Sequence, residues 1–329
     1  MTEAANTELP SVDDCRAAAR ALRGHIHTTP VFSSRRLGER VGREVSLKAE
    51  LFQRTGSFKL RGAINRVAAM CADERAAGVV TASAGNHAQA AALACAEAGI
   101  DVVVFMPSGA SATKVAATRG YGATVDLDSR DGAEALARMA SVARETGRVV
   151  LHPFDDPLVI AGQGTVGLEI AEQVPVAAAV LVPASGGGLL SGVAIAVKAL
   201  SPACRIVAVQ PERSATLRAG SGAVAAGPEQ LRGATIADAL TAPAMGRLCL
   251  RVCEALVDEV VHVSEVEIAA GMRFVYAASK LACEAGAALG VAALLAGRVS
   301  RLPSGTVVAV ISGGNITPEA VASILAGAA

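Results

Sequence analysis

One lysine stands among small and apolar residues in the stretch Arg54-Thr55-Gly56-Ser57-Phe58-Lys59-Leu60-Arg61-Gly62-Ala63. The chain has 329 residues and 30 Lys plus Arg, but few of these are lysines, so a lysine in such a setting is informative. An amine removed from water has a lowered pKa and can form a Schiff base with an aldehyde. The alternative is a solvated lysine at a helix start, and two later segments bear on this choice.

A polar turn between an expected strand and an expected helix is the first of these segments. Ser83-Ala84-Gly85-Asn86-His87-Ala88-Gln89 follows the apolar run 78–82 and precedes the alanine-rich run 90–98. This geometry presents free backbone N–H groups to an anion such as a substrate carboxylate. The alternative is a simple helix cap by Ser83.

Three consecutive glycines mark the second segment, Ser185-Gly186-Gly187-Gly188-Leu189, between an expected strand at 178–182 and an expected helix at 190–200. Glycines let a backbone turn tightly so that several N–H groups converge on a phosphate. The third glycine of a dinucleotide fingerprint is replaced by Ser191, and no G-x-x-x-x-G-K-[ST] loop is present. A phosphate outside a dinucleotide or a magnesium-bound nucleotide is therefore favoured.

These motifs, in this order, resemble the fold type II pyridoxal-phosphate enzymes, and within them the threonine and serine dehydratases and serine racemase. The resemblance runs from Thr28-Thr29-Pro30 to Ser312-Gly313-Gly314-Asn315 and includes His152-Pro153-Phe154-Asp155-Asp156. It implies pyridoxal 5'-phosphate as the cofactor. It also implies an α/β fold of two lobes, like that of the tryptophan synthase β chain, with mostly parallel sheets flanked by helices.

Alternating apolar and alanine-rich runs agree with βαβ units and mostly parallel sheets. The resemblance divides them into a large cofactor-binding lobe, 1–76 and 151–329, and a small substrate-side lobe, 77–150, with the cofactor in the cleft between them. No C-terminal regulatory domain is expected. Strands are predicted at 45–47, 78–82, 102–106, 124–127, 178–182, 206–209 and 307–311.

The resemblance implies which residues hold the cofactor. Lys59 is the catalytic residue, which carries the cofactor as a Schiff base and becomes the base for the α-proton once the substrate displaces it. The phosphate is held by backbone N–H groups of Ser185, Gly186, Gly187, Gly188 and Leu189, with Ser185 replacing a glycine common in relatives. The other implied contacts are Phe58 beside the ring, Asn86 at the phenolic oxygen, Glu284 near the cofactor and Ser312 at the pyridine nitrogen.

The same resemblance places Ser83, Ala84, Asn86 and His87 at the substrate. Serine racemase has a serine at the position of Ala84, where it acts as the acid and base on the opposite face of the ring. Alanine has no proton to give, so racemisation is disfavoured. The hydroxyl of Ser312 leaves the pyridine nitrogen neutral, which favours loss of a β-leaving group over transamination.

Other departures from the relatives concern a cation and the substrate range. Relatives activated by a divalent cation carry carboxylates where this chain has Gln210 and Thr216, and a hard cation needs charged oxygen ligands. No metal site is therefore predicted. Ala239, where relatives have glycine, and Ala285, where they have proline, leave the substrate range open.

The predicted reaction is β-elimination of water from L-threonine or L-serine, which gives 2-oxobutanoate or pyruvate and ammonia. The alternatives are a dehydratase for another β-hydroxy amino acid such as 3-hydroxyaspartate, a serine racemase, or a catalytically silent homologue. A small amino acid is the expected partner, and a homodimer is what the family implies.

Composition excludes several other classes of protein. The formal net charge is zero and the only aromatic residues are six Phe and two Tyr, which leaves no basis for binding nucleic acid. The charge-free region 175–197 contains Pro175, Pro183 and the glycines, so we expect strand, loop and helix there rather than a membrane span. The seven scattered cysteines are expected to be core residues in a reducing cytoplasm.

Overall fold

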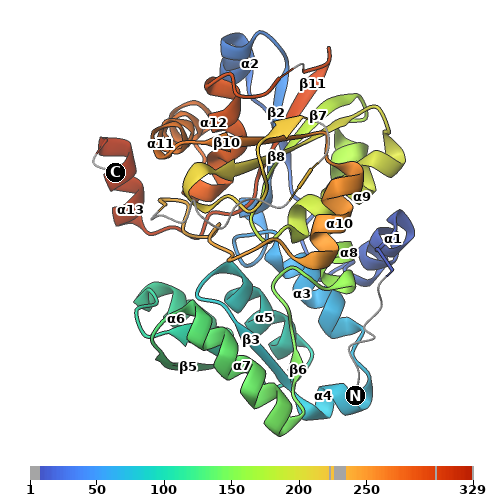
Figure 1. Cartoon of the computed structure of the whole chain (residues 1–329), viewed down its shortest axis with the longest axis vertical. Helices are drawn as coiled ribbons and strands as arrows, with labels where there is room; N and C mark the ends of the chain where they lie inside the picture. Colours follow the sequence, from blue (N-terminus) through green and yellow to red (C-terminus); the bar gives the residue numbers. More distant parts are fainter. Residues whose placement is uncertain (1–7, 222–223, 226–234, 301, 328–329) are drawn as a thin grey trace.

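The structure is a computed structural model that describes residues 8–221, 224–225, 235–300 and 302–327. It contains two sheets, which lie at opposite ends of the view in Figure 1. The large sheet has the order β1-β2-β11-β7-β8-β10-β9, and its β2, β11, β7, β8 and β10 run parallel. Its strands are β1 Val31–Ser33, β2 Val45–Ala49, β7 Ala177–Pro183, β8 Arg205–Pro211, β9 Gly220–Ser221, β10 Glu259–Val263 and β11 Thr306–Ile311.

Helices cover both faces of the large sheet because its strands alternate their apolar side chains. Along β11, Val307, Ala309 and Ile311 face one hydrophobic cluster, and Val308 and Val310 face the other. The first cluster is completed by α2 Arg35–Val41, α11 Glu265–Phe274, α12 Leu289–Leu295 and α13 Pro318–Ala326. The second is completed by α1 Val12–Ala21, α8 Pro157–Gln173, α9 Gly188–Leu200 and α10 Arg247–Leu256.

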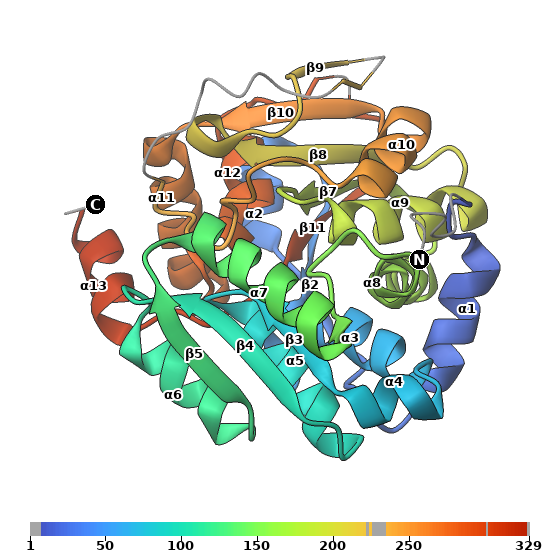
Figure 2. The same cartoon turned by 60° about the horizontal axis from the view of Figure 1, so that its bottom comes forward.

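The small sheet is fully parallel and has the order β5-β4-β3-β6. Figure 2 shows it from the side that carries α7 Gly132–Thr146, whereas α5 Asn86–Glu97 and α6 Ala112–Gly120 pack on the other face. Its strands are β3 Val79–Ala82, β4 Val102–Pro107, β5 Thr124–Ser129 and β6 Val149–Val150. The remaining elements are α3 Lys59–Ala68, α4 Ala72–Ala77, the short 3-10 helices η1 Glu50–Phe52, η2 Glu212–Ser214 and η5 Ala285–Ala288, and the π-helical turn η4 Val275–Ser279.

Helix α3 lies between the two sheets, in contact with both α5 and α8. Its contact with α8 is so close that a Cβ on Gly162 would lie 2.6 Å from the Cα of Gly62. A side chain at either position would push the helices apart, so the two glycines set where α3 runs.

The predicted α/β class with mostly parallel, helix-flanked sheets is confirmed. Each predicted strand is present, and the charge-free region 175–197 forms β7, the glycine loop and most of α9. In the part of the chain that the structure describes, no helix is both long and apolar enough to cross a membrane. The prediction that the cysteines are core residues is wrong for Cys71, which is exposed at the start of α4, whereas the other six are buried.

Candidate active site

Lys59 opens α3 and is largely enclosed by its neighbours. Its Nζ donates a hydrogen bond to the Pro153 carbonyl at 2.7 Å and lies 5.2 Å from the centre of the Phe58 ring. Removal from water lowers the pKa of the Lys59 amine to about 8. The solvated alternative for this lysine is therefore wrong, and a substantial fraction of the amine is uncharged near neutral pH.

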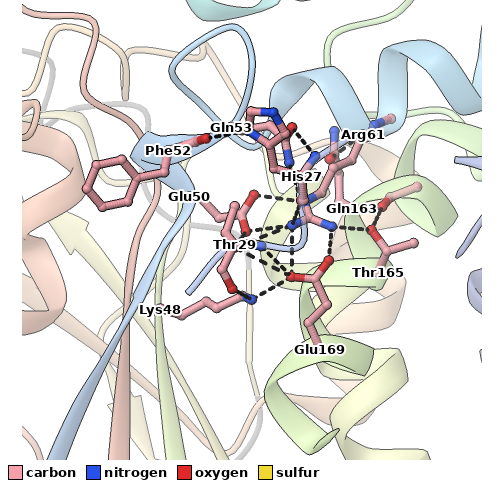
Figure 3. Close-up of polar contacts among 12 residues, drawn as sticks. His27, Thr29, Lys48, Glu50, Phe52, Gln53, Arg61, Gln163, Thr165 and Glu169 are labelled. Atoms are coloured by element: carbon pink, nitrogen blue, oxygen red, sulfur yellow. Dashed lines mark hydrogen bonds and ion pairs between the residues drawn. The ribbon is translucent and has the colours of Figure 1, made fainter. Parts of the chain in front are cut away.

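A buried ion-pair network anchors the helix that carries Lys59 (Figure 3). Arg61, two residues further along α3, is fully buried, and its guanidinium binds Glu50 at 2.8 Å and Glu169 at 2.6 Å. Lys48 of β2 adds a bond to the same Glu169 at 2.5 Å. Burial raises the pKa of Glu169, but the charges and hydrogen bonds of Arg61 and Lys48 outweigh it and hold the pKa below its usual value. The network thus ties α3 to β2 and α8.

The glycine loop sits directly before α9, whose first N–H groups have no partner inside the helix. Gly187 has φ +101°, a left-handed conformation, and a Cβ there would lie 2.1 Å from Sδ of Met245. A Cβ on Gly186 would lie 2.3 Å from the Phe154 ring. Only glycine fits these two positions. The conformation of the loop places its backbone N–H groups next to the positive end of the α9 helix dipole.

The segment Pro153-Phe154 brings the loop and the amine together. Pro153 accepts the hydrogen bond of Lys59, and the next residue, Phe154, packs on Gly186. Asp155 then accepts backbone N–H groups at the start of α10, at 2.9 Å from both Arg247 and Leu248. No role for these residues was predicted from the sequence, although they lie in the motif His152-Pro153-Phe154-Asp155-Asp156 that contributed to the resemblance.

The turn at Ser83–His87 connects β3 to α5, which begins at Asn86, earlier than predicted. Gly85 is the N-cap residue and makes no side-chain cap, while Ser83 Oγ accepts the Gly85 N–H at 3.3 Å, so the helix-cap alternative for Ser83 is wrong. His87 is buried, with Nε2 3.1 Å from the Leu151 carbonyl. Burial, with the nearby Lys59, lowers the pKa of His87 to about 3, so its ring is neutral. Its backbone N–H lies in the first turn of α5, where an anion can bind.

A cluster of polar side chains joins the start of α5 to the C-terminal motif. Asn86 Nδ2 donates to the Glu284 carboxylate at 2.9 and 3.1 Å, and its Oδ1 accepts from Asn315 Nδ2 at 2.7 Å. Glu284 also accepts the Asn315 backbone N–H at 2.8 Å. Burial raises the pKa of Glu284, although these hydrogen bonds oppose the shift. Asn315 belongs to the Ser-Gly-Gly-Asn motif, but its part in the site was not predicted from the sequence.

Ser312, directly after β11, lies against the segment that leads into Lys59. Its carbonyl accepts the Phe58 N–H at 3.1 Å, and the next residue, Gly313, forms a bridge with Ser57. Ser57 Oγ is buried without a hydrogen-bond partner within the described structure. The first and last motifs of the sequence therefore meet beside the amine.

The structure thus brings the amine, the glycine loop, the α5 turn and the C-terminal motif into one connected region. Ala84 lies in the α5 turn, partly buried. Gln210 and Thr216 lie behind the glycine loop and are hydrogen-bonded to each other. Among the described residues, no group of three or more His, Cys, Asp or Glu side chains is arranged to hold a metal ion.

The chain is similar to known proteins in its family, its sequence and its fold. A family model described as "Pyridoxal-phosphate dependent enzyme" matches residues 22–313. The L-threonine ammonia-lyase of Thermotoga maritima is 42% identical over 311 residues, which cover 93% of this chain and 76% of that protein. The catabolic L-threonine dehydratase TdcB of Escherichia coli K12 is 40% identical over 319 residues, 96% of this chain and 97% of that protein. The structure of maize serine racemase is similar with a TM-score of 0.88 at 35% identity, and the match covers 98% of both chains.

Proposed function

Because the chain belongs to the pyridoxal-phosphate dependent enzyme family, we propose that it is an ammonia-lyase that acts on L-threonine or L-serine. The prediction from the sequence motifs, that the chain is a pyridoxal-phosphate enzyme, is confirmed. In the reaction, water leaves across the Cα–Cβ bond, and hydrolysis of the C–N bond then releases ammonia and 2-oxobutanoate or pyruvate. The water lost in the first step is thus taken up again in the second. The observation that carries the proposal is the enclosed Lys59 amine, with its lowered pKa, joined through Pro153 and Phe154 to the glycine loop.

The residues present fit pyridoxal phosphate. Lys59 offers an amine that is partly uncharged near neutral pH for the aldehyde, and the loop Ser185–Leu189 offers backbone N–H groups and a helix N-terminus for the phosphate. The loop can approach a phosphate closely because its glycines have no Cβ. When bound, the cofactor supplies an electron sink for the electrons released at the substrate Cα.

Lys59 acts as the general base in this proposal. Since desolvation keeps its pKa near 8, the amine can accept the α-proton without first losing a strongly held proton. Its neighbours His87 and His152 both have lowered pKa values, each mainly through burial, so neither adds a fixed positive charge beside it. The proton on Lys59 is therefore not repelled by a positive charge on either imidazole.

Two other side chains and the backbone of the α5 turn orient the reacting groups. The hydroxyl of Ser312 would lie at the pyridine nitrogen of the bound cofactor and, as a neutral group, would leave that nitrogen uncharged, which would favour elimination. Asn86, held from both sides by Glu284 and Asn315, presents its remaining hydrogen-bonding capacity to the phenolic oxygen. The substrate carboxylate binds at the first N–H groups of α5, within the turn Ser83–His87.

The direct test is to purify the chain with pyridoxal phosphate and measure release of 2-oxo acid and ammonia from L-threonine, L-serine and 3-hydroxyaspartate. We expect turnover of L-threonine or L-serine and its loss in Lys59→Ala. Lys198→Met, which removes a lysine outside the site, is the matched control and should keep the activity. Turnover of 3-hydroxyaspartate alone would move the substrate assignment to an acidic amino acid. A cofactor-loaded chain inactive on all three would contradict the proposal.

A serine racemase is the second candidate, because a solved racemase is the structural neighbour described above. Ala84 speaks against it, since its methyl group cannot return a proton to the face of Cα opposite Lys59. We predict that Ala84→Ser raises the ratio of D-serine to pyruvate formed from L-serine, measured by chiral chromatography. D-serine formed faster than pyruvate by the unsubstituted chain would favour the racemase.

We also propose that the enzyme works as a homodimer in the cytoplasm. All seven cysteines are unpaired, which fits a reducing compartment, and the dimer rests on the family resemblance. Light scattering coupled to gel filtration tests the dimer, and a monomer mass at micromolar concentration would contradict it.

A further inference from the structure

Two buried polar side chains lie behind the glycine loop and take no part in the reaction scheme. Gln210, at the end of β8, is fully buried, and Thr216, after η2, is 7% exposed. Gln210 Nε2 donates to Thr216 Oγ1 at 2.7 Å, and Thr216 Oγ1 donates to the Ser185 carbonyl at 2.8 Å. A chain of two hydrogen bonds therefore leads from the large sheet to the first residue of the loop.

The orientation of this pair is fixed by the backbone around it. Gln210 Oε1 accepts the N–H groups of Thr216 at 3.3 Å and Leu217 at 2.9 Å. With its amide reversed, Gln210 would point a donor at two donors, so its NH2 group must face Thr216 and the Ala184 carbonyl, 3.2 Å away. The glutamine amide uses both its oxygen and its nitrogen, as a buried polar group requires.

The pair holds the backbone just ahead of the glycines. It binds the carbonyls of Ala184 and Ser185, and the Ser185 hydroxyl in turn accepts the Ala242 N–H at 3.0 Å. Both peptide units are thereby fixed before the chain turns through Gly187 into α9. The glycines that follow are the residues of the loop with the greatest conformational freedom, so their orientation depends on this fixed start.

We propose that Gln210 and Thr216 are positioning residues that preorganise the glycine loop for the cofactor phosphate. We call the pair the amide–hydroxyl clasp. The inference rests on the proposed function, in which this loop binds the phosphate. The clasp carries no charge, and its amide and hydroxyl groups are already hydrogen-bonded to each other and to the neighbouring backbone. A hard cation would need oxygen ligands where the clasp presents an amide NH2 group, so the loop is held without one.

The test compares two ligands of the full-length chain after the cofactor has been removed: pyridoxal phosphate, and pyridoxal, which lacks the phosphate. Thr216→Val keeps the size of the side chain and removes the hydroxyl, and we expect it to weaken pyridoxal phosphate binding by about ten-fold or more, the effect of losing one hydrogen bond. Pyridoxal binding should change much less. Thr216→Ser, which keeps the hydroxyl, should restore the preference for the phosphorylated ligand.

Thr81→Val is the matched control, since Thr81 is also buried and donates to the Leu151 carbonyl at the same 2.8 Å. It should lower the melting temperature without changing the ratio of the two affinities. If Thr216→Val lowers only the melting temperature, as the control does, the clasp is merely structural and the proposal is wrong. Should Thr216→Val fail to fold, Gln210→Glu gives the same comparison, because it replaces the amide donor by an acceptor.

Magnesium and EDTA form a second arm. Neither should change the affinity of the unsubstituted chain for pyridoxal phosphate, and a ten-fold gain with magnesium would contradict a clasp complete without a cation. Failure of the unsubstituted chain to bind pyridoxal phosphate at all would instead contradict the proposed function, so the two failures are distinguishable.

Discussion

Two neighbours of Lys59 favour the charged form of its amine, and the loss of water opposes them. The Pro153 carbonyl accepts a proton-bearing amine, and the Phe58 ring face favours a cation, yet loss of water outweighs both and the pKa is lowered to about 8. At pH 7 about a tenth of the amine is then uncharged, hundreds of times more than for a lysine with a pKa near 10.4. The residue is reactive because of where the chain encloses it.

This pKa predicts how the cofactor-free chain takes up pyridoxal phosphate as the pH changes. The uncharged amine is the reactive form, and it becomes dominant only above the pKa. The uptake rate should therefore rise about ten-fold per pH unit below pH 8 and level off above it. Stopped-flow absorbance from pH 6.5 to 10 measures this rate, with N-acetyl-lysine amide as the control. A rate that keeps rising to pH 10 would show an ordinary lysine.

Sequence motifs located the main residues of this region but not what surrounds them. Lys59, Asn86, Glu284 and Ser312 were singled out, and the structure places all four in the connected region described above. The role of the Pro153 carbonyl could not be predicted, because a backbone acceptor carries no signature in the side-chain sequence. For His87 the motif suggested a side chain at the substrate, whereas burial turns its ring to Leu151.

At the scale of an element, the glycine loop depends on its backbone conformation. We predict that Gly187→Ala weakens pyridoxal phosphate binding strongly, because the methyl group meets Met245 and the left-handed φ costs a further ~1 kcal/mol. Gly24→Ala is the matched control: φ there is +83°, but nothing lies within 4 Å of the added Cβ. The control should lose a similar ~1 kcal/mol of stability and keep its affinity, measured by denaturant unfolding and by cofactor titration. Equal affinities in the two variants would contradict the steric account.

The ion-pair network behind α3 predicts a larger change in the free energy of unfolding. Arg61→Met leaves Glu50 and Glu169 buried with fewer partners, which should cost about 3–5 kcal/mol of unfolding free energy. Arg16→Met removes an ion pair to Asp13 at the surface, where both side chains are about half exposed or more, and should change stability by less than ~1 kcal/mol. Urea unfolding of both variants measures the difference. A loss under 1 kcal/mol in Arg61→Met would show that the network contributes little.

Strands and helices could be predicted from the sequence where a segment has a clear apolar pattern. They were missed where charged or polar residues interrupt that pattern. Strand β10 contains Glu259 and His262, so it lacks the continuous apolar run of its neighbours. It is nevertheless buried, since Glu259 pairs with Arg205 at 2.9 Å. Lys48, Arg61 and Glu169 were missed as a group for a related reason: their partners lie far apart in the sequence, and a single sequence does not show which charges meet.

On the scale of the whole molecule, the ion pair between Lys114 and Asp238 joins the two sheet layers at their surface. Lys114 of α6, beside the small sheet, binds Asp238 from the segment before α10 at 2.5 Å. Because Asp238 is 62% exposed, the pair should add less than ~1 kcal/mol to stability. We predict that Lys114→Met leaves the unfolding midpoint nearly unchanged and raises the KM for the amino acid a few-fold, since it frees the small sheet to move away from the large one.

Lys198→Met serves as the control for that measurement. Lys198 pairs with Asp258 at 2.8 Å, and both residues belong to the large-sheet layers. It should therefore leave the KM unchanged in a steady-state assay of 2-oxo acid release. An equal rise of the KM in both variants would contradict a role for the contact between the layers.

The strand order has a consequence for how the protein is made. The small sheet is contiguous in sequence, so all its strands have left the ribosome once residue 150 has emerged. The large sheet waits for β11, which lies between β2 and β7 and is its last strand to be synthesised. Ser312, the neighbour of Phe58, arrives with it. Lys59 is thus translated early but receives its surroundings only after β11 has been synthesised, so cofactor capture must wait for the last strand of the large sheet.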